Sequence, residues 1–146
     1  MTVDSSQMAA ALGLTPHPEG GYYVETWRGP ATGDGRSTGT AIYYLLEERS
    51  HWHRVDADEL WLFHAGAPLT LSIAADGATP NDVELGPDID AGQRPQALVP
   101  ARSWQSAVSA GPWTLVSCVV VPGFDFDGFE LAPPGWSPSE WSPPAG

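Results

Sequence analysis

Short apolar or alternating segments, separated by glycine, proline and aspartate, run through most of this chain and constrain its fold more than any other feature. Segments of this kind, bounded by turn-forming residues, are typical of β-strands packed in a sandwich or barrel. We therefore expect an all-β fold. The predicted strands comprise residues 22–27, 40–46, 51–55, 59–64, 69–74, 96–99, 104–108 and 113–121, with another short strand around 83–85.

Helix signals are confined to the start of the chain. Asp4 or Ser5 can accept the first free backbone N–H groups of a helix over residues 7–12. Gly13 can adopt the left-handed conformation that ends such a helix. The sequence therefore predicts one short N-terminal helix ahead of the β structure.

Proline sets the last residues apart from the rest of the chain. A stretch with five prolines from residue 132 onward lacks the N–H donors of a central strand, so we expect it to lie along the surface. Trp136 and Trp141 are its predicted docking anchors. At 146 residues the chain has the length of one domain. We predict a single domain over residues 1–131 and a Pro-rich C-terminal tail over residues 132–146.

The charge of the chain excludes several classes of partner. A formal net charge of −12 and an isoelectric point near 4.3 would repel nucleic acid and an anionic membrane surface, so neither is an expected partner. All six basic residues are arginine, which excludes Schiff-base chemistry on a lysine. The N-terminus lacks a basic cluster and no apolar run approaches the roughly 20 residues of a membrane span, which predicts a cytoplasmic location.

Two histidines and a glutamate form the strongest candidate site. His51 and His53 are two residues apart, so in a strand both imidazoles would point to the same side of the sheet. Glu59 follows a predicted turn and could return its carboxylate to the same point. Two histidines and one carboxylate suit a divalent transition metal such as Fe, Mn, Ni or Zn, and they equally suit a metal-free acid–base pocket.

The spacing around these residues resembles a known family. His51, His53, Glu59 and Gly66 resemble the first cupin motif, with one extra residue between histidine and glutamate. The segment from Pro100 to Gln105 resembles the second motif, with glutamine in place of its histidine, the fourth expected metal ligand. Three further segments resemble the small single-domain cupin 5 family, namely PHPEGGYY at 16–23, TAIYYLL at 40–46 and PGFDF at 122–126.

This resemblance carries expectations about fold and activity. It implies a double-stranded β-helix, or jelly roll, that forms a homodimer. It also links the chain to sugar-nucleotide epimerases and other isomerases of the cupin superfamily, without indicating a substrate.

Further residues are candidate ligand contacts. Glu59 and Trp61 are two residues apart, so both lie on the same face of their predicted strand. A carboxylate desolvated there would have a raised pKa. Tyr43 and Tyr44 lie on opposite strand faces, so one of them can enter the cavity, but alternation does not say which. The other predicted contacts for a small-molecule ligand are Glu19 and Tyr23 near the Gly-Gly turn, His51, and the strand amides Gln96 and Gln105.

Three functions remain open from the sequence. The leading hypothesis is an isomerase or epimerase in which His53 is the general base, Glu59 orients it and a tyrosine is the acid. The second is a non-catalytic cupin that binds a polar metabolite. The third is a metal-dependent oxygenase or hydrolase that uses His51, His53 and Glu59.

Overall fold

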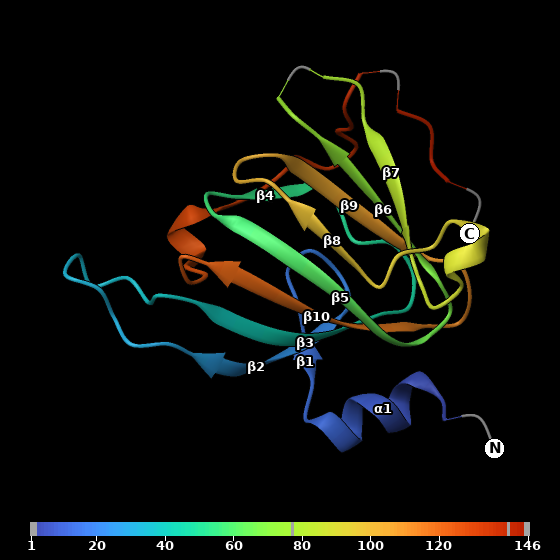
Figure 1. Cartoon of the computed structure of the whole chain (residues 1–146), viewed down its shortest axis with the longest axis horizontal. Helices are drawn as coiled ribbons and strands as arrows, with labels where there is room; N and C mark the ends of the chain where they lie inside the picture. Colours follow the sequence, from blue (N-terminus) through green and yellow to red (C-terminus); the bar gives the residue numbers. More distant parts are fainter. Residues whose placement is uncertain (1–2, 77, 140, 145–146) are drawn as a thin grey trace.

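Two antiparallel β-sheets face each other and form a jelly roll (Figure 1). The computed structural model describes residues 3–76, 78–139 and 141–144. The six-stranded sheet has the order β1 (Thr15–Pro16), β2 (Tyr22–Arg28), β3 (Thr40–Leu46), β10 (Thr114–Val121), β5 (Asp58–Gly66) and β8 (Gln96–Val99). The five-stranded sheet has the order β11 (Phe129–Leu131), β4 (His53–Val55), β9 (Trp104–Ser109), β6 (Leu69–Ala74) and β7 (Asn81–Leu85). The predicted all-β class with a short N-terminal helix is confirmed.

The helix α1 (Ser5–Leu12) lies outside the two sheets (Figure 1). Asp4 is its N-cap: its side chain accepts from the backbone N–H of Gln7, while the Gln7 side chain accepts from the backbone N–H of Asp4. This reciprocal capping box satisfies two donors that the first turn leaves free. Gly13 ends the helix in the left-handed conformation, with φ of 70°.

Strand β10 lies between β3 and β5 in the centre of the larger sheet. Its residues alternate between buried and half-buried, and Cys118 and Val120 point inward. In the register with β5, Cys118 pairs with Trp61 and Val120 pairs with Glu59. This alternation places the Glu59 carboxyl and the Cys118 thiol on the interior face of one sheet.

The main core fills the space between the sheets. Leucine side chains that are fully buried here each contribute roughly 1.5–3 kcal/mol relative to exposure. The buried members of this core are Tyr44, Leu46, Trp61, Leu69, Leu71, Leu85, Val99, Ala107, Val116 and Cys118.

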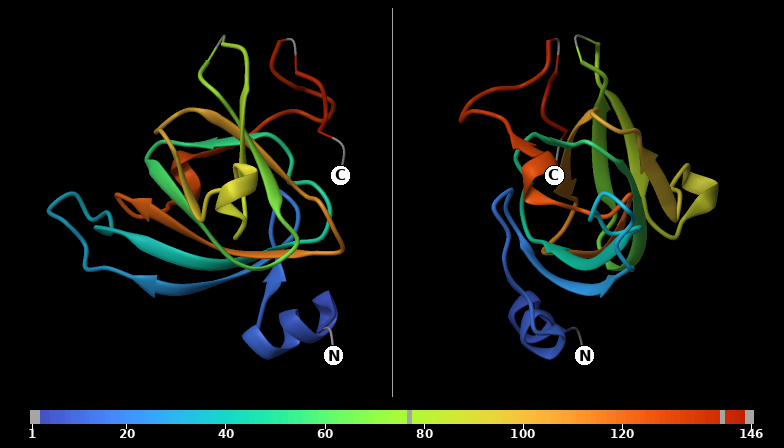
Figure 2. Two further views of the ribbon diagram at one scale, coloured as in Figure 1. Left: turned by 45° about the vertical axis from the view of Figure 1, so that its right-hand side comes forward. Right: turned by 90° about the vertical axis from the view of Figure 1, so that its left-hand side faces the viewer.

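A second, smaller cluster attaches the C-terminal tail. Trp52 and Trp104 are buried against Trp136 and Trp141 of the tail. The predicted role of both tail tryptophans as anchors is confirmed, and Figure 2 shows the tail returning along the outside of the jelly roll. Residues 140, 145 and 146 of the predicted tail lie outside the described residues.

Two further short helical turns complete the structure, η1 (Ile89–Ala91) and η2 (Phe126–Gly128). The turn η2 leads directly into β11, which pairs with β4 and brings Phe129 beside Val55. Within the described part of the chain, no helix combines the length and the apolar character needed to cross a membrane.

Candidate functional site

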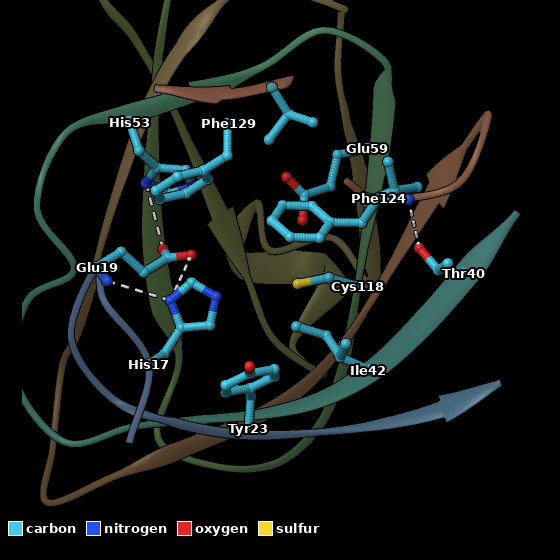
Figure 3. A pocket seen from close by; sticks show the side chains of 12 residues that line it. His17, Glu19, Tyr23, Thr40, Ile42, His53, Glu59, Cys118, Phe124 and Phe129 are labelled. Carbon is cyan, nitrogen blue, oxygen red and sulfur yellow. Dashed lines mark hydrogen bonds and ion pairs between the residues drawn. The ribbon is translucent and has the colours of Figure 1, made fainter. Parts of the chain in front are cut away.

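A small cavity lies between the two sheets and contains several predicted site residues (Figure 3). Its volume is about 30 Å³, and an outer pocket of about 300 Å³ shares Tyr23, Thr40, Ile42 and Phe124 with it. The cavity and the outer pocket therefore adjoin. The described residues that line the inner cavity are His17, Glu19, Tyr23, Thr40, Ile42, His53, Val55, Glu59, Cys118, Val120, Phe124 and Phe129.

Glu59 is held at the cavity by a chain of hydrogen bonds between the sheets. The Trp61 Nε1–H donates to Gln105 Oε1 at 2.9 Å, and Gln105 Nε2 donates to Glu59 Oε1 at 2.7 Å. Because the indole can only donate, it determines which end of the Gln105 amide faces Glu59. Burial raises the pKa of Glu59 from 4.5 to about 7, against the lowering effect of hydrogen bonds from Gln105 and Cys118.

His53 presents one ring nitrogen as a base. It is 1% exposed, and its Nδ1 lies 2.9 Å from the backbone oxygen of His51, so Nδ1 carries the proton and donates it. The neutral ring then has its lone pair on Nε2. Burial lowers the pKa of His53 from 6.5 to about 4, so the imidazole is neutral at physiological pH. The ring stacks on Phe129 with a centroid distance of 5.6 Å.

Glu19 lies between two histidines (Figure 3). Its Oε1 is 3.4 Å from His17 Nδ1 and its Oε2 is 3.2 Å from His53 Nδ1. The second contact is not a directed hydrogen bond because the His53 Nδ1–H points to the His51 carbonyl, and Oε2 has no hydrogen-bond partner among the described residues. Oε2 of this buried carboxyl is therefore an unused acceptor.

Burial, rather than ion pairing, dominates the protonation of this cluster. The pKa of Glu19 is raised well above 4.5 by burial and by the Glu59 charge, which outweigh a lowering effect of the nearby Tyr44 hydroxyl. Burial lowers the pKa of His17 to about 4. His17 Nδ1 already accepts the backbone N–H of Glu19 at 3.1 Å, which also favours its neutral form. The two histidine contacts of Glu19 are consequently not full ion pairs at neutral pH.

Two glycines place Glu19 at this point. Gly20 and Gly21 follow it with φ of 106° and 78°, in a region that side chains rarely adopt. A Cβ on Gly21 would lie 2.7 Å from the Leu45 carbonyl oxygen. The turn therefore needs glycine both for its backbone angles and for its close approach to β3.

The structure decides between the two neighbouring tyrosines. Tyr44 is 1% exposed and points inward, where its hydroxyl donates to the Gly20 carbonyl at 2.6 Å. Tyr43 is 36% exposed on the other face of β3. Tyr23, rather than either of them, lines the cavity, with its ring 4.6 Å from that of His17.

His51 does not reach the cavity. The strand β4 begins at His53, so the expected alternation of the two imidazoles on one strand face does not apply. Instead, His51 Nε2 lies 2.9 Å from the Ala132 oxygen and 3.1 Å from the Pro133 oxygen, where it holds the tail. The expectation that His51, His53 and Glu59 converge is corrected by this placement.

The residues at the cavity do not fit the metal site of the cupin motif. Gln105 directs its NH₂ group toward Glu59 and its oxygen toward Trp61, and it does not line the cavity. Among the described residues, no group of three His, Cys, Asp or Glu side chains is placed to hold one metal ion. Only His53 and Glu59 of the three predicted ligands line the cavity.

The remaining predicted contacts divide into two groups. Glu19 and Tyr23 line the cavity. Gln105 does not line it but donates a hydrogen bond to Glu59, which does. Trp61 is 1% exposed in the core and acts through Gln105, so it does not form a wall of the cavity. Gln96 is exposed on β8 and does not line the cavity.

Sequence reasoning overlooked several lining residues. His17 had a signal, since it lies between two prolines in the segment 16–23 that carries the family resemblance. Phe124 belongs to another such segment, at 122–126. Thr40 belongs to a third segment, at 40–46. Cys118 and Phe129 had no local signal, because only the packing of distant strands brings them to the cavity.

Comparisons with known proteins agree with this fold. Residues 6–132 match the family described as Cupin superfamily (DUF985). A crystal structure of a protein from Shewanella oneidensis is 38% identical, with a TM-score of 0.85 over 90% of this chain and 85% of that chain. A hypothetical protein from Leishmania major is 32% identical, with a TM-score of 0.80 over 88% of this chain and 86% of that chain.

More distant similarity concerns the fold alone. Oxalate decarboxylase from Bacillus subtilis is 12% identical, with a TM-score of 0.59 over 80% of this chain and 29% of that chain. No curated protein sequence matches the chain significantly.

Proposed function

Since this chain belongs to the Cupin superfamily (DUF985), we propose that its cavity binds a small polar molecule and transfers a proton on it, as an isomerase or epimerase does. The protonation of Glu59 carries this proposal. A carboxyl with a pKa of about 7 that faces a cavity is a suitable acid–base catalyst at neutral pH. One hydrogen bond from Gln105, whose amide Trp61 orients, holds the Glu59 carboxyl in position.

His53 and Glu59 have complementary protonation states. Near pH 6, His53 is a neutral base with Nε2 available, and Glu59 is largely a protonated acid. His53 Nε2 would remove the proton from a carbon next to a carbonyl, and the C–H electron pair would pass to the carbonyl oxygen to give an enolate. Glu59 would then give its proton to the opposite face of that carbon. The reverse reaction starts from the protonated imidazole and the carboxylate.

The roles differ in two respects from those expected from the sequence. Glu59 contacts Gln105, while His53 is contacted by Glu19, so Glu59 does not orient His53. The Tyr44 hydroxyl donates to the Gly20 carbonyl, which leaves Glu59 as the better acid.

The dimensions of the site favour a small substrate, because the inner cavity of about 30 Å³ admits only the reacting end of the substrate. The outer pocket accommodates the remainder.

Hydrogen exchange tests this proposal without knowledge of the natural substrate. Glycolaldehyde, hydroxyacetone and pyruvate would be incubated with the protein in D₂O near pH 6, and deuterium at the carbon next to the carbonyl measured by ¹H NMR. We expect enzyme-dependent exchange of at least one probe, reduced at least about 100-fold by Glu59→Gln and by His53→Ala. The variant Asp90→Asn, which removes an exposed carboxyl on η1, should exchange at the wild-type rate.

A binding module is the second candidate function. The orphaned acceptor Glu19 Oε2 favours it, because a bound polar ligand would satisfy that atom without any reaction. Probes that bind in the cavity but exchange only at the uncatalysed rate would refute the catalytic proposal and support the module.

A further inference from the structure

We propose that the cavity selects a small amino compound, whose ammonium group binds Glu19 Oε2, and that it rejects anionic ligands. This inference deepens the proposed function by naming a ligand class, and it rests on the same cavity. The two buried carboxyl groups, the unpartnered Oε2 of Glu19 and the absence of cationic side chains in the lining all contribute to it.

The composition of the cavity wall favours a cation over an anion. The wall contains two buried carboxyls, Glu19 at 9% exposure and Glu59 at 7%. All six basic residues of the chain are arginines within the described residues, and none of them lines the inner cavity. An anionic ligand such as a carboxylate or phosphate would therefore meet two acids and two neutral histidines, His17 and His53, without a compensating charge.

The outer pocket does not supply that missing charge either. Arg28 is the arginine that lines it, and its Nε already donates to Glu25 Oε1 at 2.7 Å while Nη2 donates to the Phe124 carbonyl at 3.2 Å. Asp125 also lines the outer pocket. The approach to the cavity therefore carries a net negative charge, and the whole chain has a formal charge of −12. The resulting electrostatic field attracts cations.

Glu19 Oε2 provides the specific contact. It is buried in a residue that lines the cavity, and it has no hydrogen-bond partner among the described residues. Figure 3 shows the carboxyl between His17 and His53, with one oxygen beside each ring. An ammonium N–H is the donor that such an acceptor lacks. The aromatic rings of Tyr23, Phe124 and Phe129 complete the wall, and their faces are attractive to a cation.

Binding of a cation changes which carboxyl carries the proton. The titratable groups that face one another here come from several elements: His17 and Glu19 before β2, Tyr44 on β3, His53 on β4, Glu59 on β5 and Cys118 on β10. An ammonium beside Glu19 favours its carboxylate, so the Glu19 proton is released to solvent. Glu59 keeps its proton, because a second negative charge nearby would be unfavourable, and it can still act as the acid.

Three probes of equal size test the inference with the intact protein. Propylammonium, 1-propanol and acetate would each be titrated by NMR at constant ionic strength, with the Trp61 indole N–H as reporter because it connects through Gln105 to Glu59. We expect propylammonium to bind at least tenfold more tightly than 1-propanol and acetate not to shift the reporter. Calorimetry in buffers of different ionisation enthalpy should detect proton release with propylammonium and none with 1-propanol.

Variants assign the contact to its residue. Glu19→Gln should abolish the tenfold preference for the cation, whereas Asp90→Asn, which also removes one negative charge, should preserve it. Acetate binding as tightly as propylammonium, or no probe binding at 100 mM, would overturn the inference, and neither result needs a variant that folds. Amine binding without deuterium exchange would instead refute the proposed catalysis and leave this inference standing.

Discussion

Gln105 stands where the second cupin motif has a histidine, and the orientation of its amide determines what Glu59 can do. The Trp61 indole takes the amide oxygen, so the amide NH₂ donates to the Glu59 carboxyl. This donor lowers the pKa of a buried acid that desolvation alone would raise further. At this position the amide therefore supports the Glu59 carboxyl, on which the proposed acid–base chemistry depends.

Replacement of Gln105 should destabilise the protein, whereas replacement of Gln96 should not. Gln105→Leu leaves the Trp61 N–H and the Glu59 carboxyl without these partners. We expect each unpaired group to lower the free energy of unfolding by about 1–3 kcal/mol. It should also raise the pKa of Glu59 above about 7, which NMR titration would measure. Gln96→Leu, on an exposed position of β8, should change stability by less than about 0.5 kcal/mol.

Stability should depend on pH through Glu59. The pKa of Glu59 is about 7 in the folded state and near 4.5 when unfolded, so the folded protein binds the proton more tightly. Its contribution is complete below pH 4.5 and is lost as pH rises toward 7, by up to about 3 kcal/mol. We expect the difference in unfolding free energy between wild type and Glu59→Gln to change over this interval, as measured by urea denaturation. A difference that is constant with pH would contradict the raised pKa.

At the level of elements, β4 and the tail decide the role of His51. The chain before β4 is held by non-strand contacts: the backbone N–H of Ser50 donates to Ala107, and that of His51 donates to Glu19. Strand geometry therefore begins only at His53, and the imidazole of His51 turns to the tail. A pattern of alternating residues cannot reveal such an interruption, since it arises from contacts with distant segments.

Loss of the His51 side chain should loosen the tail and spare the cavity. His51→Ala removes its hydrogen bonding to the Ala132 and Pro133 carbonyls, and we expect a destabilisation of about 0.5–1.5 kcal/mol with altered NMR signals of the Trp136 and Trp141 indoles. His64→Ala, which removes a histidine from the outer face of β5, should leave those signals unchanged. If His51→Ala abolished ligand binding or deuterium exchange without unfolding the tail, this assignment would fail.

The limits of most strands followed from local patterns. Strands over 40–46, 69–74 and 96–99 were predicted with the bounds that the structure shows, because each is apolar or alternating and is flanked by turn residues. The strands β1 and β11 were not predicted. They are two and three residues long, and only pairing with β2 and β4 makes them strands.

At the scale of the whole molecule, the donor geometry predicts weak metal binding. Protein purified without a histidine tag should contain less than about a tenth of an equivalent of Fe, Mn, Ni or Zn, since His53 and Glu59 have no third protein ligand among the residues that the structure describes. Elemental analysis measures this directly, and added EDTA should not lower the melting temperature. A stoichiometric metal that depends on His53 and Glu59 would show that ligands from elsewhere complete the site.

The homodimer expected from the family resemblance also stays a prediction for the whole molecule. Trp27 is 51% exposed on β2, and Tyr43 on the adjacent β3 is 36% exposed, so the outer side of the larger sheet carries aromatic surface that a second copy could cover. Light scattering should give twice the 15.5 kDa monomer mass, and Trp27→Glu should reduce it to the monomer value. A monomeric wild type would contradict the expectation.

The sequence by itself determined the β class, the helix with its caps, most strands and the role of the tail tryptophans, because alternation, turn residues and capping act over a few neighbouring positions. The motif also identified His53, Glu59 and Gln105 as central residues. Only the tertiary structure decided that His51 faces the tail, that Gln105 donates to Glu59 and that Glu19 lies between His17 and His53. These outcomes depend on which buried polar atoms find partners across separate segments, and burial then sets their pKa values.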